Sequence, residues 1–161
     1  MQKIVTNLWF DTEAEEAVEL YTSIFDNSKI KGVQRYGEAG PGPEGSVMVV
    51  DFQLEGQDFT AINGGPEFKF NEAISLLVNC ETQDEVDELW DKLLAGGGRE
   101  QQCGWLKDKY GLSWQIVPTI LGELLSSGDA ERTNSVMKAL LGMVKLDVET
   151  LKKAYENPQS A

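Results

Sequence analysis

Histidine is absent from this sequence of 161 residues, and positive charge is scarce. Fourteen Lys and Arg stand against 27 Asp and Glu, which gives a formal net charge of −13 at pH 7. This charge repels phosphate backbones and anionic lipids, so we expect no nucleic-acid partner and no membrane partner. Without histidine, a Ser-His-Asp triad, a Cys-His dyad and a histidine zinc site are excluded, and the commonest general base is missing.

Cysteine is also rare, since only Cys80 and Cys103 occur. Two cysteines form no disulfide framework, and we expect a reducing, cytoplasmic compartment. A nucleophilic cysteine needs a base or a cation beside it, which favours packed thiols at both positions. The first residues lack the apolar stretch of a signal peptide, and no apolar run approaches the roughly 18–20 residues of a membrane span.

A regular order of strand and helix patterns occurs twice in the chain. In each copy, one strand pattern leads to an amphipathic helix and then to three further strand patterns. Each helix opens with the spacing of a capping box, at Thr12 and again at Thr82, 70 residues later. The expected strands are Lys3–Phe10, Lys29–Gly37, Ser46–Leu54 and Asp58–Asn63, and then Ala73–Cys80, Arg99–Gly104, Trp105–Tyr110 and Ser113–Pro118.

The segment that follows Pro118 has a different pattern. Its apolar residues recur at helical spacing, which predicts three amphipathic helices that must cover the sheet or a second subunit. We therefore expect a first βαβββ module at 1–65, a second at 66–118 and a C-terminal helical extension at 119–161. The fold class is α+β.

Five residues in or beside the predicted strands are candidates for lining a cavity. Gln115 lies in an otherwise apolar strand, so its amide either bonds a neighbouring strand or faces a cavity. Tryptophans in strands belong either to the core or to an apolar pocket. No G-x-G-x-x-G loop opens a helix, which argues against a bound nucleotide or S-adenosylmethionine. The candidate cavity residues are Trp9, Asn63, Cys103, Trp105 and Gln115.

Several segments together resemble one known family. They are Leu8–Asp11 with Ala14–Ala17, Asn63–Phe68, Ser75–Cys80, Cys103–Asp108, Ser113–Pro118 and the tail Met137–Tyr155. The chain resembles the PhnB-like proteins of the vicinal oxygen chelate superfamily, the glyoxalase and bleomycin-resistance fold, a group sometimes labelled 3-demethylubiquinone-9 3-methyltransferase. The resemblance implies two modules that form a curved sheet around a cavity, and a homodimer that often exchanges elements.

The resemblance also implies where metal-dependent members hold their ion. These positions fall near Thr6, near Ala61 or Asn63, near Ala73 and at Gln115. Alanine has no ligating atom, and glutamine is a neutral, weak ligand in place of the usual Glu. We therefore expect no metal and no cofactor.

These observations favour a metal-free protein that binds a small molecule of unknown identity. The alternative is an enzyme of the same fold that acts on a small organic substrate, as a metal-dependent lyase or dioxygenase or as the labelled methyltransferase. A third hypothesis is an interaction module, in which truncation at Pro118 abolishes the dimer. We also expect the protein to be a homodimer under the first hypothesis.

Overall fold

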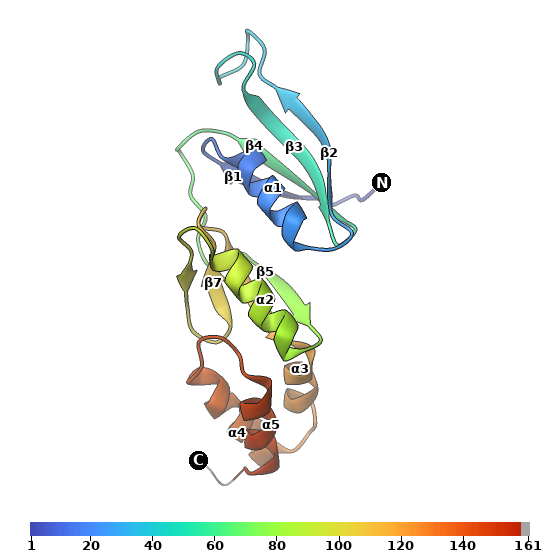
Figure 1. Ribbon diagram of the computed structural model, residues 1–161, viewed down its shortest axis with the longest axis vertical. Helices are drawn as coiled ribbons and strands as arrows, with labels where there is room; N and C mark the ends of the chain where they lie inside the picture. Colours follow the sequence, from blue (N-terminus) through green and yellow to red (C-terminus); the bar gives the residue numbers. More distant parts are fainter. Residues whose placement is uncertain (159–161) are drawn as a thin grey trace. The chain divides into compact units, whose positions relative to one another are not determined.

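A computed structural model describes residues 1–158 and shows two compact units, Met1–Phe70 and a second that begins at Asn71. Each unit is built around one four-stranded sheet, with the order β1-β4-β3-β2 in the first and β5-β8-β7-β6 in the second (Figure 1). In both sheets the first strand pairs in parallel with the last strand of its unit. The duplicated βαβββ topology and the α+β fold class are therefore confirmed.

The first unit contains five elements, and its helix covers one face of the sheet. Strand residues alternate between buried and accessible positions, as expected for a sheet with one covered face. Leu8, Phe52 and Ala61 point toward the helix and pack with its buried side chains, such as Val18 and Tyr21. The elements are β1 (Thr6–Phe10), α1 (Ala14–Ile24), β2 (Lys29–Arg35), β3 (Val47–Leu54) and β4 (Gln57–Asn63).

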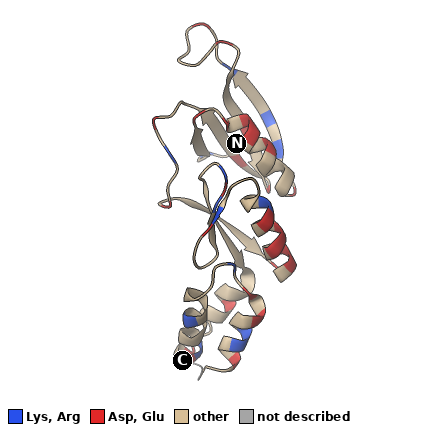
Figure 2. Ribbon diagram, turned by 60° about the vertical axis from the view of Figure 1, so that its left-hand side comes forward, with Lys and Arg blue, Asp and Glu red and all other residues tan. Residues whose placement is uncertain are grey.

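The second unit repeats this arrangement with shorter strands. Leu106, Trp114 and Ile116 are buried on the helix-facing side of the sheet, against the apolar stripe that Leu89 and Leu93 contribute. The elements are β5 (Ser75–Cys80), α2 (Gln83–Leu94), β6 (Arg99–Glu100), β7 (Trp105–Lys107) and β8 (Ser113–Pro118). Figure 2 shows that Asp and Glu gather along α1 and α2, which matches the charged helix faces of the sequence pattern.

Three helices follow β8 within the second unit and share a small core. They are α3 (Thr119–Leu125), α4 (Ala130–Leu141) and α5 (Val148–Glu156). Their buried side chains form one cluster, which Val117 at the end of β8 joins: Leu121, Leu124, Val136, Leu146 and Leu151. The predicted helical extension is therefore present, and its last residues, 159–161, lie outside the described part.

Two local predictions were wrong. Thr12 does not cap α1, because the helix begins at Ala14 and no side chain of its N-cap residue, Glu13, bonds the first turn. Thr82, by contrast, accepts a hydrogen bond from Glu85 N at 3.2 Å, as predicted for α2. The strands expected at Arg99–Gly104 and Trp105–Tyr110 are also shorter. The first ends at Glu100, before the left-handed backbone at Cys103 and Gly104, and the second ends at Lys107, where Asp108 begins a turn.

Candidate functional site

Three residues form a row across the face of sheet β5-β8-β7-β6 that is turned away from α2. Leu77 of β5 pairs with Gln115 of β8, and Gln115 pairs with Trp105 of β7. Leu77 is 51% exposed, whereas Gln115 and Trp105 are half-buried. The row is thus an apolar surface with one amide at its centre. We call these three residues, with Ser75 and Ser113 of the adjacent row, the Gln115 site.

The amide of Gln115 is held within the sheet at one end. Its Nε2 donates to Ser75 Oγ on the neighbouring strand at 2.8 Å, which is one of the two possibilities that the sequence left open. Within residues 1–158, no donor bonds Oε1 of Gln115. The amide is therefore oriented by the protein and keeps one acceptor for another molecule.

Ser113 supplies a second polar group to the Gln115 site. It is fully buried, and its Oγ has no hydrogen-bond partner in the described part of the chain. Buried hydroxyls nearly always have a partner, so an unpaired one marks a place for water or for a ligand. Lys107, which pairs with Ser113 across the strands, forms an ion pair with Glu72. None of the five residues of the Gln115 site carries a charge, and Lys107 beside them is paired.

Trp9 has a structural role in the first unit. It lies on the face of sheet β1-β4-β3-β2 opposite α1, since its neighbours Leu8 and Phe10 are buried on the helix side. Its indole Nε1 donates to Gly65 O at 3.0 Å, and its ring meets Phe68 edge-on at 4.9 Å. Trp9 therefore holds the segment that follows β4 against the sheet of the first unit.

Asn63 lies on the helix side of the first sheet and replaces Thr12 as the side chain that caps α1. Its Oδ1 accepts from Ala14 N at 2.8 Å, and its Nδ2 donates to Val47 O at 3.1 Å. Tyr36 donates its hydroxyl to the backbone oxygen of Asn63 at 2.5 Å. Both ends of this amide are used, so Asn63 acts as a structural link between α1, β3 and β4.

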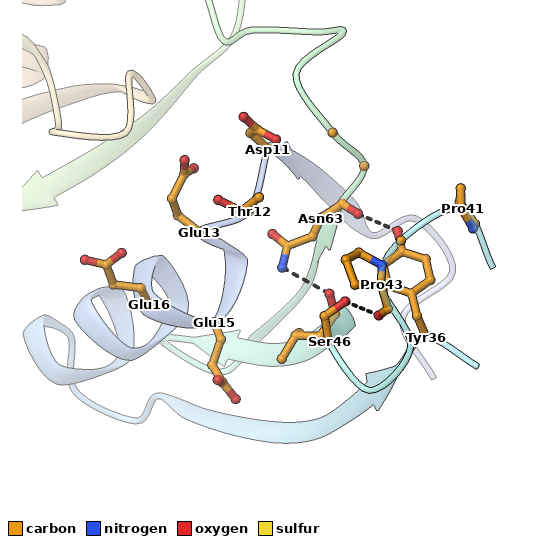
Figure 3. A pocket seen from close by; sticks show the side chains of 14 residues that line it. Asp11, Thr12, Glu13, Glu15, Glu16, Tyr36, Pro41, Pro43, Ser46 and Asn63 are labelled. Atoms are coloured by element: carbon orange, nitrogen blue, oxygen red, sulfur yellow. Dashed lines mark hydrogen bonds between the residues drawn. The ribbon is translucent and has the colours of Figure 1, made fainter. Parts of the chain in front are cut away.

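Asn63 also lines a pocket of about 570 Å³ at the N-terminus of α1 (Figure 3). Carboxylates of the first helical turn and of the segment before it form its rim, where they are favourable to the helix dipole. This role accounts for the acidic rim, and we assign no ligand to the pocket. Its lining comprises Asp11, Thr12, Glu13, Glu15, Glu16, Tyr36, Pro41, Gly42, Pro43, Ser46, Val47, Asn63, Gly64 and Gly65.

The two cysteines differ in their surroundings, and both are free. Cys80 is fully buried, and burial, followed by the negative charge of Glu85, raises its thiol pKa to about 12. Cys103 lies in the loop before β7 and is half-buried. Its backbone N–H donates to Met143 O at 2.8 Å, which ties this loop to the helical extension.

The structure brings two of the five candidate residues together, because Trp105 and Gln115 are cross-strand neighbours. Trp9 and Asn63 lie on opposite faces of the first sheet, and Cys103 lies outside the strands. Sequence reasoning missed Ser75, Leu77 and Ser113. The signal for them is the strand register, which becomes visible only when β5 and β8 are paired.

Comparison with known proteins gives the family. Residues 2–117 match the sequence profile of the 3-demethylubiquinone-9 3-methyltransferase family. The chain belongs to this family. The matched segment comprises both modules, whereas α3, α4 and α5 follow it. A comparison with curated proteins gives no match.

One solved structure with substantial sequence identity agrees with this result. A PhnB protein from Bacillus cereus is 43% identical with a TM-score of 0.68, and the match covers 73% of this chain and 100% of that chain. Protein PA1353 from Pseudomonas aeruginosa is 19% identical with a TM-score of 0.60, covering 73% and 98%, which supports the fold alone. A glyoxalase/bleomycin resistance protein/dioxygenase domain from Frankia sp. gives 15% identity and a TM-score of 0.47 over 73% and 92%.

The residues at the positions implied for a metal do not fit one. Thr6 and Ala61 lie on the helix side of the first sheet, and both ends of the Asn63 amide are bonded. Ala73 offers no side-chain donor, and Gln115 offers one neutral oxygen. Residues 1–158 contain no cluster of three or more Cys, Asp and Glu side chains suited to a metal ion.

Residues 1–158 also show no glycine-rich loop that opens a helix and fits the sulfonium cofactor which the family's name implies. Such loops place glycines directly before a helix N-terminus. In the described part of the chain, Gly64 and Gly65 follow β4, whereas Gly96–Gly98 follow the end of α2. None of the five helices there is long and apolar enough to cross a membrane.

Proposed function

We propose that this protein binds a small, neutral, partly aromatic molecule at the Gln115 site, without a metal. The observation that supports the proposal is the oriented amide of Gln115, whose Nε2 is held by Ser75 while Oε1 keeps an open acceptor. Trp105 and the exposed Leu77 flank this acceptor and offer apolar contact. Small-molecule sites typically combine such an apolar lining with a few polar anchors.

The charge of the site and of the whole chain narrows the ligand class. The five residues of the Gln115 site carry no charge, and Lys107 beside them is compensated by Glu72. The net charge of −13 further disfavours anions. The expected ligand is therefore uncharged and carries a hydroxyl or N–H that donates to Oε1 of Gln115.

The test uses 2-naphthol as the probe and naphthalene as the probe without the hydroxyl. Calorimetry or fluorescence measures both affinities for the wild type, for Gln115→Met and for the control Gln57→Met, an exposed residue of β4. We expect 2-naphthol to bind the wild type about tenfold more tightly than naphthalene, since that factor corresponds to about 1.4 kcal/mol. Gln115→Met should remove this difference and Gln57→Met should keep it. A wild type that binds neither probe contradicts the proposal.

An enzyme is the second candidate, and the family's own description supports it. That description names methyl transfer to 3-demethylubiquinone. Thermal melts should therefore be measured with S-adenosylmethionine, with a short-chain demethylubiquinone analogue and with 2-naphthol, because a ligand of the native state raises the melting temperature. A shift with both compounds and none with 2-naphthol would favour the enzyme.

We further propose that the protein is a homodimer in a reducing compartment such as the cytoplasm. The two free thiols support the compartment. Helix α4 supports the dimer, since Leu141 is 62% and Met137 39% exposed. Light scattering on the full chain gives the mass directly, and a monomer at micromolar concentration would refute the dimer.

A further inference from the structure

A short segment of the extension, residues 143–147 between α4 and α5, lies against the loop before β7. We call this segment the strap. Two parallel contacts hold it, from Cys103 N to Met143 O and from Gly104 N to Val144 O, each at 2.8 Å. The approach is close, because a Cβ on Gly104 would lie 3.0 Å from Leu146 Cγ. Only glycine fits at this point of the loop, where φ is 83°.

Gln83, the first residue of α2, clamps the strap from the other side. Its Nε2 donates to Leu146 O at 3.0 Å, and its Oε1 accepts from Val148 N at 2.7 Å. Nε2 also donates to Asp87 Oδ1 at 3.0 Å, which fixes the orientation of the amide. One side chain thus bonds the backbone at two points, at Leu146 in the strap and at Val148 where α5 begins.

The loop that the strap holds leads directly into the Gln115 site. Gly104 immediately precedes Trp105. The backbone oxygen of Gly104 accepts from Ile116 N at 2.8 Å, and Ile116 immediately follows Gln115. The position of Gly104 therefore sets the backbone beside both the aromatic wall and the amide anchor.

We propose that Gln83 is a positioning residue for the Gln115 site and acts through the strap. This inference rests on the proposed function. It also gives the extension a role, since the strap follows the segment that matches the family profile. When Gln83 loses its two backbone bonds, the strap releases Cys103 and Gly104, and Trp105 moves relative to Gln115.

The variants are Gln83→Met, which removes both backbone bonds, and Gln83→Glu, which keeps the acceptor for Val148 N. The control is Lys92→Met, which removes the exposed pair with Glu88 on α2 at 2.7 Å and leaves the strap and both backbone bonds of Gln83 in place. Three readouts apply to the full chain: the fluorine NMR signal of 5-fluorotryptophan at position 105, the reaction rate of Cys103 with Ellman's reagent, and the affinity for 2-naphthol. The buried Cys80 contributes little to the thiol rate.

In Gln83→Met, we expect a shifted or broadened Trp105 signal, a Cys103 reaction faster by roughly tenfold and 2-naphthol affinity lower by roughly tenfold. Gln83→Glu should resemble Gln83→Met, because its second carboxylate oxygen faces the acceptors Leu146 O and Asp87 Oδ1, and Lys92→Met should resemble the wild type. If Gln83→Met only lowers the melting temperature and leaves the Trp105 signal and the Cys103 rate unchanged, the positioning role is refuted. If the wild type does not bind 2-naphthol, the proposed function fails, while the Trp105 and Cys103 readouts still decide whether Gln83 acts through the strap.

Discussion

Asp108 organises the turn between β7 and β8. It is 3% exposed, and its Oδ1 accepts from Tyr110 N at 2.9 Å and from Leu112 N at 3.1 Å. Its Oδ2 accepts from the indole of Trp114 at 2.9 Å. The carboxylate of this turn is therefore a structural anchor. A buried charge of this kind persists because several donors satisfy it.

Removal of this anchor should destabilise the second unit. We expect Asp108→Ala to lower the free energy of unfolding by about 3 kcal/mol, because three donors lose their acceptor and two of these bonds are buried. Trp114→Phe, which removes one donor, is the milder comparison. Urea unfolding at neutral pH measures both variants. A cost for Asp108→Ala below that of Trp114→Phe would contradict the anchoring role.

The two thiols should differ in reactivity. Because burial raises the pKa of Cys80 to about 12, almost none of its thiolate exists near neutral pH. Ellman's reagent should therefore modify one cysteine rapidly in the native chain, and the second only after unfolding. Cys103→Ser should abolish the fast reaction, and a fast phase that survives in this variant would place the reactive thiol at Cys80.

At the scale of elements, the two modules cap their helices in different ways. Helix α2 uses the local hydroxyl of Thr82, whereas α1 uses Asn63, which is distant in sequence and comes from the end of β4. A local motif is readable from four consecutive residues, and for this reason the Thr82 cap was predictable. The cap from Asn63 depends on the tertiary structure. The residues around Thr12 therefore give no sign that α1 is capped by a distant residue and not by a local hydroxyl.

Three substitutions test this difference. Thr82→Ala should cost about 1 kcal/mol, the usual value of an N-cap. Thr12→Ala should cost less than about 0.5 kcal/mol, as at an ordinary surface position. Asn63→Ala should cost about 2 kcal/mol, because it breaks two hydrogen bonds of partly buried groups. Chemical denaturation measures the free energy of unfolding of the three variants. An equal cost at Thr12 and Thr82 would contradict the predicted order.

The hairpin of β3 and β4 should contribute to stability in a pH-dependent way. Hydrogen bonds from Gln53 and then Lys31 hold the pKa of Asp58 below its ordinary value of 3.8. A carboxylate whose folded pKa is depressed stabilises the protein above the unfolded value, and this contribution is lost as the pH falls through the folded value. The contribution is thus complete above pH 3.8 and fades below it.

Urea midpoints between pH 6 and pH 2.5 check this sign. In Asp58→Asn, we expect a smaller decline of the midpoint below pH 4 than in the wild type. Glu88→Gln, which removes an exposed pair with Lys92, is the control. A decline that is steeper in Asp58→Asn than in the wild type would reverse the predicted sign.

At the scale of the whole molecule, the order of helices and strands was predictable from the sequence. Which side chains share one face of a sheet was not. Period-two and helical patterns identified both modules and the extension, since these patterns are local. The assignment of Trp9 and Asn63 to opposite faces depends on the pairing of β1 with β4. For the same reason the sequence did not identify Ser75 and Ser113 as site residues, because they become neighbours only when β5 pairs with β8.

The extension should stabilise the second unit selectively. A chain that ends at Pro118 loses the strap, and with it the partners of Gln83, Cys103 and Gly104. Hydrogen exchange read by mass spectrometry should then show lost protection in α2 and β7, while β3 and β4 keep theirs. Equal loss in β3 and β4 would contradict this prediction. Light scattering on the same chain tests whether the extension also maintains the dimer.

Strand β2 forms one edge of the first sheet and has a further consequence for the chain. Its pairing with β3 shifts at Ile30/Gly32 and again at Gln34/Arg35, and Lys29 and Lys31 are exposed along it. Interrupted register and positive charge make an edge a poor template for another strand. This edge therefore resists stacking with other copies of the chain, which protects the protein from fibrous aggregation when it is concentrated.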